Sequence, residues 1–333
     1  MFLIEGKKLH IEKALTLAPM AGVGDYAFRI LCKKYGAEFL TSEMVSAKGM
    51  YYRDSNTGEL AALRSSEAPA AVQLFGSDPD IMAWAADALT RCDYKGCRTQ
   101  IVPSAIDINM GCPVKKVVSG GDGSALMKKP ELIFDIVRAV NRATPLPVTV
   151  KIRAGWDAEH INAIECAKAA EEAGASAITV HGRTREQMYS PPVDLGIIRA
   201  VKEAVKIPVI GNGGINSSAE ALEMLSSTSC DGIAVARGAE GNPFIFAQIR
   251  AAINGEPIPE FDLHERIRCA LDHIDLVCED IGEERAIPRV RKHAAWYLHG
   301  LRGSAQVRAR IMNANTKDEM TSLLRGFEET FEE

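Results

Sequence analysis

The chain has 333 residues, of which 39 are lysine or arginine and 44 are aspartate or glutamate, giving a formal net charge of -5. Hydrophobic residues make up 47% and charged residues 25%, a balance typical of a globular enzyme and not of a disordered or disulfide-stapled chain. The mild acidity gives no overall electrostatic reason to bind nucleic acid, so such binding would need a local basic patch.

Eight short apolar or β-branched runs follow one another along the chain. We expect strands at 15–20, 39–42, 71–75, 106–110, 148–152, 177–181, 209–211 and 232–236. Amphipathic helices are expected between them, at 26–35, 81–90, 131–142, 161–173, 197–205 and 219–225. This alternation predicts a (β/α)8 TIM barrel over residues 1–250. A doubly wound sheet is the alternative, weakened because no G-x-G-x-x-G follows the first strand.

The sequence changes character after Pro257 and Pro259. Helical periodicity continues without a strand signal, so we expect a small all-helical C-terminal domain over residues 251–333. Residues 285–310 hold seven arginines or lysines and no acidic residue, interleaved with Trp296 and Tyr297. Such a segment suits a phosphate backbone with stacked bases. A solvated helix face with Trp296 in the domain core is the alternative.

The cellular compartment is predicted from sequence features that the chain lacks. No apolar run approaches the length of a membrane span, and residues 1–8 lack the apolar segment of a secretory signal. The eight cysteines are scattered without a C-x-x-C pair, which argues against a zinc site or a disulfide framework. We therefore expect a cytoplasmic monomer with reduced thiols, no membrane contact and no metal.

Several predicted strands end in residues that can carry chemistry, at the barrel end where active sites lie. The run I-P-V-I-G-N-G-G-I at 207–215 and the later Arg237 favour a phosphate site, although tight turn geometry would also need the glycines. Cys112 lies in a G-C-P turn, and three roles are open for it: a proton donor, a nucleophile or a structural thiol. Lys151 and His181 could bind an anionic ring, or Lys151 could form a rim salt bridge.

Taken together, the motifs resemble the tRNA-dihydrouridine synthases, and the stretch R-V-R-K-H-A-A-W-Y-L (289–298) is similar to their bacterial B-type branch. The matching segments are L-A-P-M-A-G-V-G-D-Y-A-F-R (17–29), D-I-N-M-G-C-P-V-K-K-V (107–117), G-S-A-L-M (123–127), V-K-I-R-A-G-W (150–156), V-H-G-R-T-R (180–185), I-G-N-G-G-I (210–215) and A-R-G-A-E-G-N-P-F-I-F (236–246). The resemblance implies an enzyme with tightly bound FMN that reduces uridine in the tRNA D-loop to 5,6-dihydrouridine, with NADPH as reductant.

The resemblance also implies residue roles. FMN would be surrounded by Pro19, Met20, Ala21, Gln73, Lys151, His181, Asn212, Gly213, Gly214, Ala236 and Arg237. Cys112 would donate a proton to carbon 5 of the uracil, which Asn109 and Arg183 would hold. Within the basic segment, the tRNA contacts are expected at Arg289, Arg291 and Lys292.

The chain departs from the family pattern at three places. Ala236-Arg237 replaces the usual Gly-Arg, Gly24 before Asp25 stands where threonine is common, and residues 91–104, with Cys92 and Cys97, form a longer segment than is typical. We expect little consequence from Gly24 and a loop insertion at 91–104.

Three other functions remain open. An FMN barrel acting on a free pyrimidine would leave the basic helical segment unexplained. A flavin-free aldolase or isomerase would use Lys151 as a Schiff base. A non-catalytic RNA-binding barrel would leave Cys112, Lys151 and His181 without a task.

Overall fold

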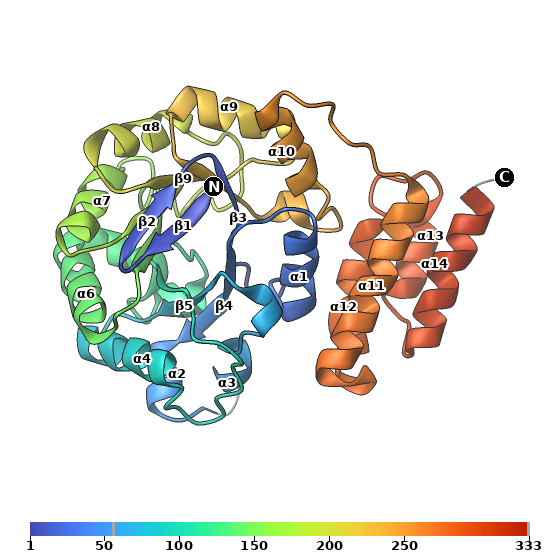
Figure 1. The fold of residues 1–333 in the computed structure, drawn as a ribbon, viewed down its shortest axis with the longest axis horizontal. Coiled ribbons are helices and arrows are strands. Elements are labelled where there is room, and N and C mark those ends of the chain that lie inside the picture. The colour runs from blue at the N-terminus through green and yellow to red at the C-terminus, as the bar shows by residue number, and fades with distance from the viewer. Residues whose placement is uncertain (55–56, 332–333) are drawn as a thin grey trace.

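The computed structural model of the chain describes residues 1–54 and 57–331, with an eight-stranded parallel barrel at its centre (Figure 1). Its strands are β3 (Ala14–Leu17), β4 (Leu40–Ser46), β5 (Ala70–Phe75), β6 (Ala105–Asn109), β7 (Val148–Arg153), β8 (Ala177–His181), β9 (Val209–Asn212) and β10 (Gly232–Val235). The hydrogen-bonded order is β3-β10-β9-β8-β7-β6-β5-β4. A parallel bridge between Thr16 and Phe39 closes the circle. All eight predicted strands and the predicted TIM barrel are confirmed.

Helices cover the outside of the barrel because the strands bury nearly all of their side chains and need cover on the outer face. The helices following the strands are α1 (Tyr26–Lys34), α4 (Pro79–Arg91), α6 (Pro130–Ala143), α7 (Ala163–Glu172), α8 (Leu195–Ala204), α9 (Ser218–Thr228) and α10 (Ile245–Asn254). Shorter segments are α2 (Ala47–Tyr51), α3 (Thr57–Leu60), α5 (Lys115–Val118), η1 (Ser65–Glu67), η2 (Gly123–Lys128) and η3 (Arg237–Ala239). The six predicted helices between the strands are confirmed.

An antiparallel hairpin that the sequence analysis did not predict precedes the barrel. It pairs β1 (Phe2–Glu5) with β2 (Lys8–Ile11). Leu9 and Ile11 join a buried cluster with residues from inside the barrel, and the ring of Phe2 stacks on that of Phe39 with centroids 4.2 Å apart. The hairpin thereby covers the amino-terminal end of the barrel, and the carboxyl-terminal end is left for a site.

Four helices form the C-terminal domain that the sequence predicted: α11 (Leu263–Ile281), α12 (Glu283–Tyr297), α13 (Ser304–Ile311) and α14 (Lys317–Phe331). They lie beside α1 (Figure 1), and their hydrophobic core includes Ala27 and Leu31 from that helix. The predicted boundary at residue 250 falls inside α10, so the connection between the two parts is residues 255–262. At Gly241, which has a φ of +64°, an added Cβ would lie 2.3 Å from the backbone of Trp296. The barrel and α12 are therefore in direct backbone contact there.

One prediction about the cysteines is wrong. The structure has a disulfide between Cys92 and Cys97, whereas the sequence predicted only reduced thiols. Cys92 ends α4 in the left-handed conformation with a φ of +54°, which turns the chain back and brings the two Cα atoms to 5.9 Å. Scattered spacing along the whole chain hid this local pair. The other six cysteines are free.

None of the described helices has both the length and the apolar character to cross a bilayer.

Candidate active site

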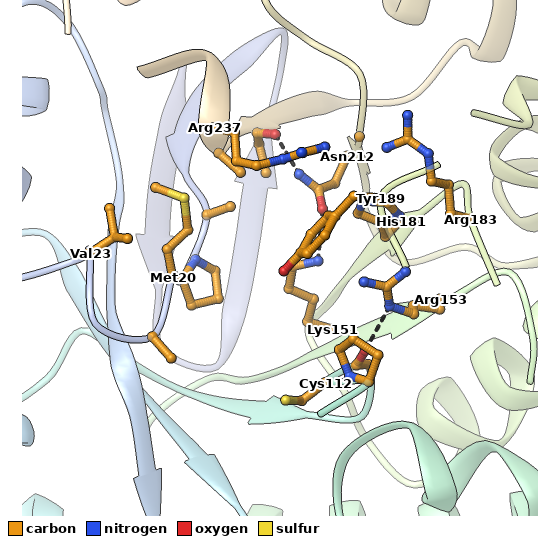
Figure 2. A pocket seen from close by; sticks show the side chains of 18 of the residues that line it. Met20, Val23, Cys112, Lys151, Arg153, His181, Arg183, Tyr189, Asn212 and Arg237 are labelled. Atoms are coloured by element: carbon orange, nitrogen blue, oxygen red, sulfur yellow. Dashed lines mark hydrogen bonds between the residues drawn. The ribbon is translucent and has the colours of Figure 1, made fainter. Parts of the chain in front are cut away.

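A cavity of about 340 Å³ opens at the carboxyl-terminal ends of the barrel strands (Figure 2). It is within the size range of cofactor and substrate pockets. The fourteen site residues predicted in the barrel all line it: Pro19, Met20, Ala21, Gln73, Asn109, Cys112, Lys151, His181, Arg183, Asn212, Gly213, Gly214, Ala236 and Arg237. The fold therefore brings together residues that lie more than two hundred positions apart in the sequence.

Lys151 is fixed at the floor of the cavity by Asn212. Its Nζ donates to Oδ1 of Asn212 over 2.8 Å, and the amide of Asn212 donates in turn to the carbonyl of Ala234 over 2.7 Å. Burial, and then the neighbouring Arg153, lower the pKa of Lys151 to about 7. Near neutral pH this side chain can therefore gain or lose its charge in response to a bound anion.

Polar groups without partners face the cavity from β8 and the loop after it. Nδ1 of His181 and both Nε and Nη1 of Arg183 are buried and hydrogen-bond to no described residue. Burial, and then Lys151, lower the pKa of His181 well below its usual range, so the imidazole is neutral. Because unpaired buried polar atoms are costly, the cavity is suited to a polar or anionic ligand that supplies their partners.

The glycine turn and the arginine that the sequence singled out for a phosphate site both line the cavity, at Gly213, Gly214 and Arg237. The start of α9 is capped from within, since Ser217 accepts from the amide of Glu220 and the Glu220 carboxylate accepts from the amide of Asn216. Gly213 has a φ of +110°, and an added Cβ would lie 3.2 Å from the His181 ring, so this turn requires glycine.

Ala236, one of the three departures from the family pattern, also lies at this end of the cavity. Its φ is -118° and its ψ is -108°, so it lies outside the left-handed region that favours glycine.

A hydrogen-bonded chain of side chains leads from the barrel interior to Cys112. Asp107 accepts from the amide of Gln73 over 2.6 Å, and Gln73 accepts from the amide of Asn109 over 2.8 Å. Oδ1 of Asn109 then accepts from the backbone amides of Gly111 and Cys112 over 3.2 and 2.9 Å. The amides of Gln73 and Asn109 are thus largely occupied inside the protein, where they orient the loop that carries the thiol.

The Cys112 thiol is free and half-buried at the cavity wall (Figure 2). Burial is the main cause that raises its pKa, outweighing the lowering effects of the Val114 backbone amide and of Arg153. At neutral pH it is therefore a neutral thiol, which can donate a proton.

Several residues of the cavity region were not predicted, and three of them make contacts that organise the site. Arg153 donates to the carbonyls of Gly111, Thr184 and Met188, and the ring of Tyr189 lies 4.3 Å from the guanidinium of Arg237. Asp107, at the start of the hydrogen-bonded chain, is fully buried, and burial raises its pKa to about 6. Strand alternation could have indicated two of them, because Arg153 is two residues after Lys151 and Asp107 is two residues before Asn109. Tyr189 comes from an irregular loop and gave no such signal.

The predicted tRNA contacts on α12 lie outside the cavity and are partly used within the protein. Arg289 pairs with Glu59 over 2.9 Å, Arg291 donates to the carbonyl of Ala314 over 2.8 Å, and Lys292 donates to the carbonyl of Gly22 at the rim of the barrel. The charges of Arg291 and Lys292 are not cancelled by these bonds, since carbonyl oxygens are uncharged.

The rest of the basic segment divides between surface and core. In the part of the chain that the structure describes, no carboxylate pairs with Arg302, Arg308 or Arg310. Tyr297 is only 1% exposed and cannot stack on a base, whereas Trp296 is half-buried. The alternative placed Trp296 in the domain core, but Trp296 is only half-buried and the core aromatic is its neighbour Tyr297.

Comparisons with known proteins agree with one another. A family model described as dihydrouridine synthase matches residues 16–332. A protein of Rickettsia conorii named probable tRNA-dihydrouridine synthase is 42% identical over 91% of this chain and 89% of its own length. A protein of Shewanella oneidensis named tRNA-dihydrouridine synthase B is 38% identical over 94% of this chain and 95% of its own length.

A solved structure is similar in fold alone. It is a 6-hydroxypseudooxynicotine amine oxidase from Pseudomonas geniculata, with a TM-score of 0.53 and 14% identity over 76% of this chain and 49% of that chain.

Proposed function

The chain belongs to the dihydrouridine synthase family, whose members are flavin-dependent oxidoreductases, and on that premise we propose that it reduces the carbon 5–carbon 6 double bond of a uridine in the D-loop of tRNA. The reductants are FMN and NADPH, and the reaction takes place in the cytoplasm. The observation that carries this proposal is a neutral, half-buried thiol, Cys112, across a cationic cavity from the glycine turn at 213–214.

The residues of the cavity fit FMN. The turn at Gly213 and Gly214, together with Arg237, would hold its phosphate, and Pro19, Met20 and Ala21 would contact its ring system. When bound, FMN would supply the hydride for carbon 6 of the uracil, with NADPH as the source of reducing equivalents. Lys151 would bind an anionic part of the ring, which would restore the charge that burial disfavours. The unpaired Nδ1 of His181 gains a partner from the same ligand.

Cys112 donates the proton that completes the reduction at carbon 5. Its backbone amide donates to Oδ1 of Asn109, so the hydrogen-bonded series of side chains that begins at Asp107 orients the loop with the thiol. The reaction needs the protonated form, and the raised pKa of Cys112 supplies that form throughout the neutral range. Arg183, whose guanidinium has unpaired N–H groups in the cavity region, holds a carbonyl of the uracil, and Asn109 lies beside it.

The helical domain binds the tRNA. Arg291 and Lys292, with the further cations Arg308 and Arg310, attract the phosphate backbone. Lys292 also lies near the carboxylates of Glu43 and Glu240, which offset part of its charge. Lys292 contacts the loop at Gly22 on the rim of the cavity, so the basic segment is continuous with the barrel mouth. The target base leaves its stack to enter the cavity, which is least costly in a loop that is already partly unstacked.

Mass mapping of unmodified tRNA tests the proposal. The tRNA is incubated with the protein, FMN and NADPH, and a gain of two hydrogens at one D-loop uridine is expected. A yellow protein that oxidises NADPH but leaves the tRNA unchanged and reduces orotate would indicate a free-pyrimidine enzyme. A colourless protein trapped by borohydride with a carbonyl substrate would refute the flavin assignment.

A further inference from the structure

Three side chains that can bind a metal meet where the barrel contacts the helical domain, outside the cavity described above. Asp25 precedes α1 of the barrel, His273 lies on α11 and His293 on α12. One ligand atom from each lies within 4.8 Å of those of the other two. Both imidazoles are only 1% exposed.

The two histidines lack the hydrogen bonds that buried rings normally make. Neither Nδ1 nor Nε2 of His293, nor Nε2 of His273, hydrogen-bonds to any described residue. Each Nε2 lies 3.8 Å from a carboxylate oxygen of Asp25, which is beyond hydrogen-bond length. Leaving three ring nitrogens unpaired in the interior is costly, so the arrangement indicates a missing partner between the rings and the carboxylate.

A metal ion fits this gap better than a proton. Two groups that share a proton approach to about 2.7–2.9 Å, so the present distances are too long. Tetrahedral zinc bonds of about 2.0–2.1 Å place neighbouring ligand atoms about 3.3–3.4 Å apart. Each imidazole nitrogen lies 3.8 Å from Asp25 and the three ligand atoms lie within 4.8 Å of one another, so they must approach one another by about 0.5–1.5 Å.

We propose that Asp25, His273 and His293 bind a zinc ion that fastens the helical domain to the barrel. Two imidazoles and one carboxylate form a ligand set that suits this ion. Nδ1 of His273 lies 3.2 Å from the hydroxyl of Tyr297, an outer contact of the kind that orients metal-bound histidines. The ion would hold the basic segment of α12 in a fixed orientation over the barrel mouth.

The site has a route to solvent and room for a fourth ligand. The Asp25 side chain is 30% exposed and lines a small cleft of about 100 Å³, together with Glu43 and Arg289. A water molecule from this cleft completes the coordination.

Zinc binding is measured on the full-length protein, without flavin or tRNA. Metal-stripped protein is titrated with zinc sulfate, and bound zinc and the melting temperature are recorded. We expect about one zinc ion per chain and a higher melting temperature with zinc. Asp25→Asn should weaken zinc binding at least about 100-fold, because it removes the anionic ligand but keeps a side chain that caps α1. His293→Gln should have the same effect.

His264→Gln is the matched control, since His264 is exposed on α11 and pairs with Glu328 at the surface. It should bind zinc as the wild type does. The proposal is refuted if the wild type takes up no zinc, or if Asp25→Asn binds as tightly as the wild type. If His293→Gln does not fold, the wild type and Asp25→Asn decide the outcome.

Discussion

Replacing Cys112 by alanine removes the thiol that we propose as the proton donor. Because burial raises the pKa of Cys112, no more than about 3% of this thiol is ionised at pH 7. In the wild type, nearly all of the Cys112 thiol is therefore protonated and able to act as the acid. A positioned general acid contributes about 10²–10⁴-fold to the rate, or about 2.7–5.5 kcal/mol of barrier, and the variant should lose that amount. The side chain is half-buried, so the change should cost little folding stability.

The assay separates the two halves of the reaction in a stopped-flow experiment. Reduction of the bound flavin by NADPH should keep its wild-type rate, while reoxidation by tRNA slows by the stated factor. Cys278→Ala, which removes another half-buried thiol on α11, should leave both rates unchanged. Reoxidation of Cys112→Ala at the wild-type rate would refute the reasoning.

The pH profile gives a second reading of the same side chain. A thiol acid is lost as pH rises through its pKa, so the reoxidation rate should hold through neutrality and fall only above about pH 8.5. Cys112→Ser should be slow at every pH and lack this alkaline decline, because a hydroxyl stays protonated there. A decline between pH 6 and 8 would assign the titrating group elsewhere.

Three further predictions concern the cofactor, the tRNA and the contact between the two parts. The pKa of Lys151 is lowered to about 7 and should rise when FMN binds, so binding should take up protons above pH 7 and weaken toward pH 9. Calorimetry in two buffers measures this uptake, and Lys151→Met should abolish it. Replacing both Arg308 and Arg310 by alanine should lower the slope of log affinity for tRNA against log salt by about 1.5–2, while flavin reduction is unchanged. An unaltered slope would exclude these contacts. Gly241→Ala should lower the free energy of unfolding by about 1–3 kcal/mol more than Gly255→Ala in urea titrations, since both have positive φ but a Cβ at 255 meets no described atom within 4 Å. Equal losses would contradict the proposed backbone contact.

The sequence by itself determined the barrel and most of the residues of the cavity. The spacing of hydrophobic residues that predicts strands and helices is a local property of the sequence. In a barrel of parallel strands, the residues that follow the strands all lie at the same end, where the active site is found. Cys112, Lys151 and His181 could be placed together for this reason before their distances were known. The charge of the basic segment at 285–310 was also visible, because no acidic residue interrupts it.

Tertiary structure alone decided what surrounds these residues. Hydrogen bonds connect Asp107 and Asn109 through Gln73 on a neighbouring strand, and Lys292 contacts Gly22. These contacts join segments that are distant in the sequence, which no local pattern encodes. The cysteine spacing predicted no metal, yet the fold brings two histidines of the helical domain close to Asp25, a residue to which the sequence analysis gave no role. Ligand sets assembled from distant segments depend on how the helices pack, and the packing depends on burial summed over the whole chain. Spacing in a single sequence therefore cannot reveal them.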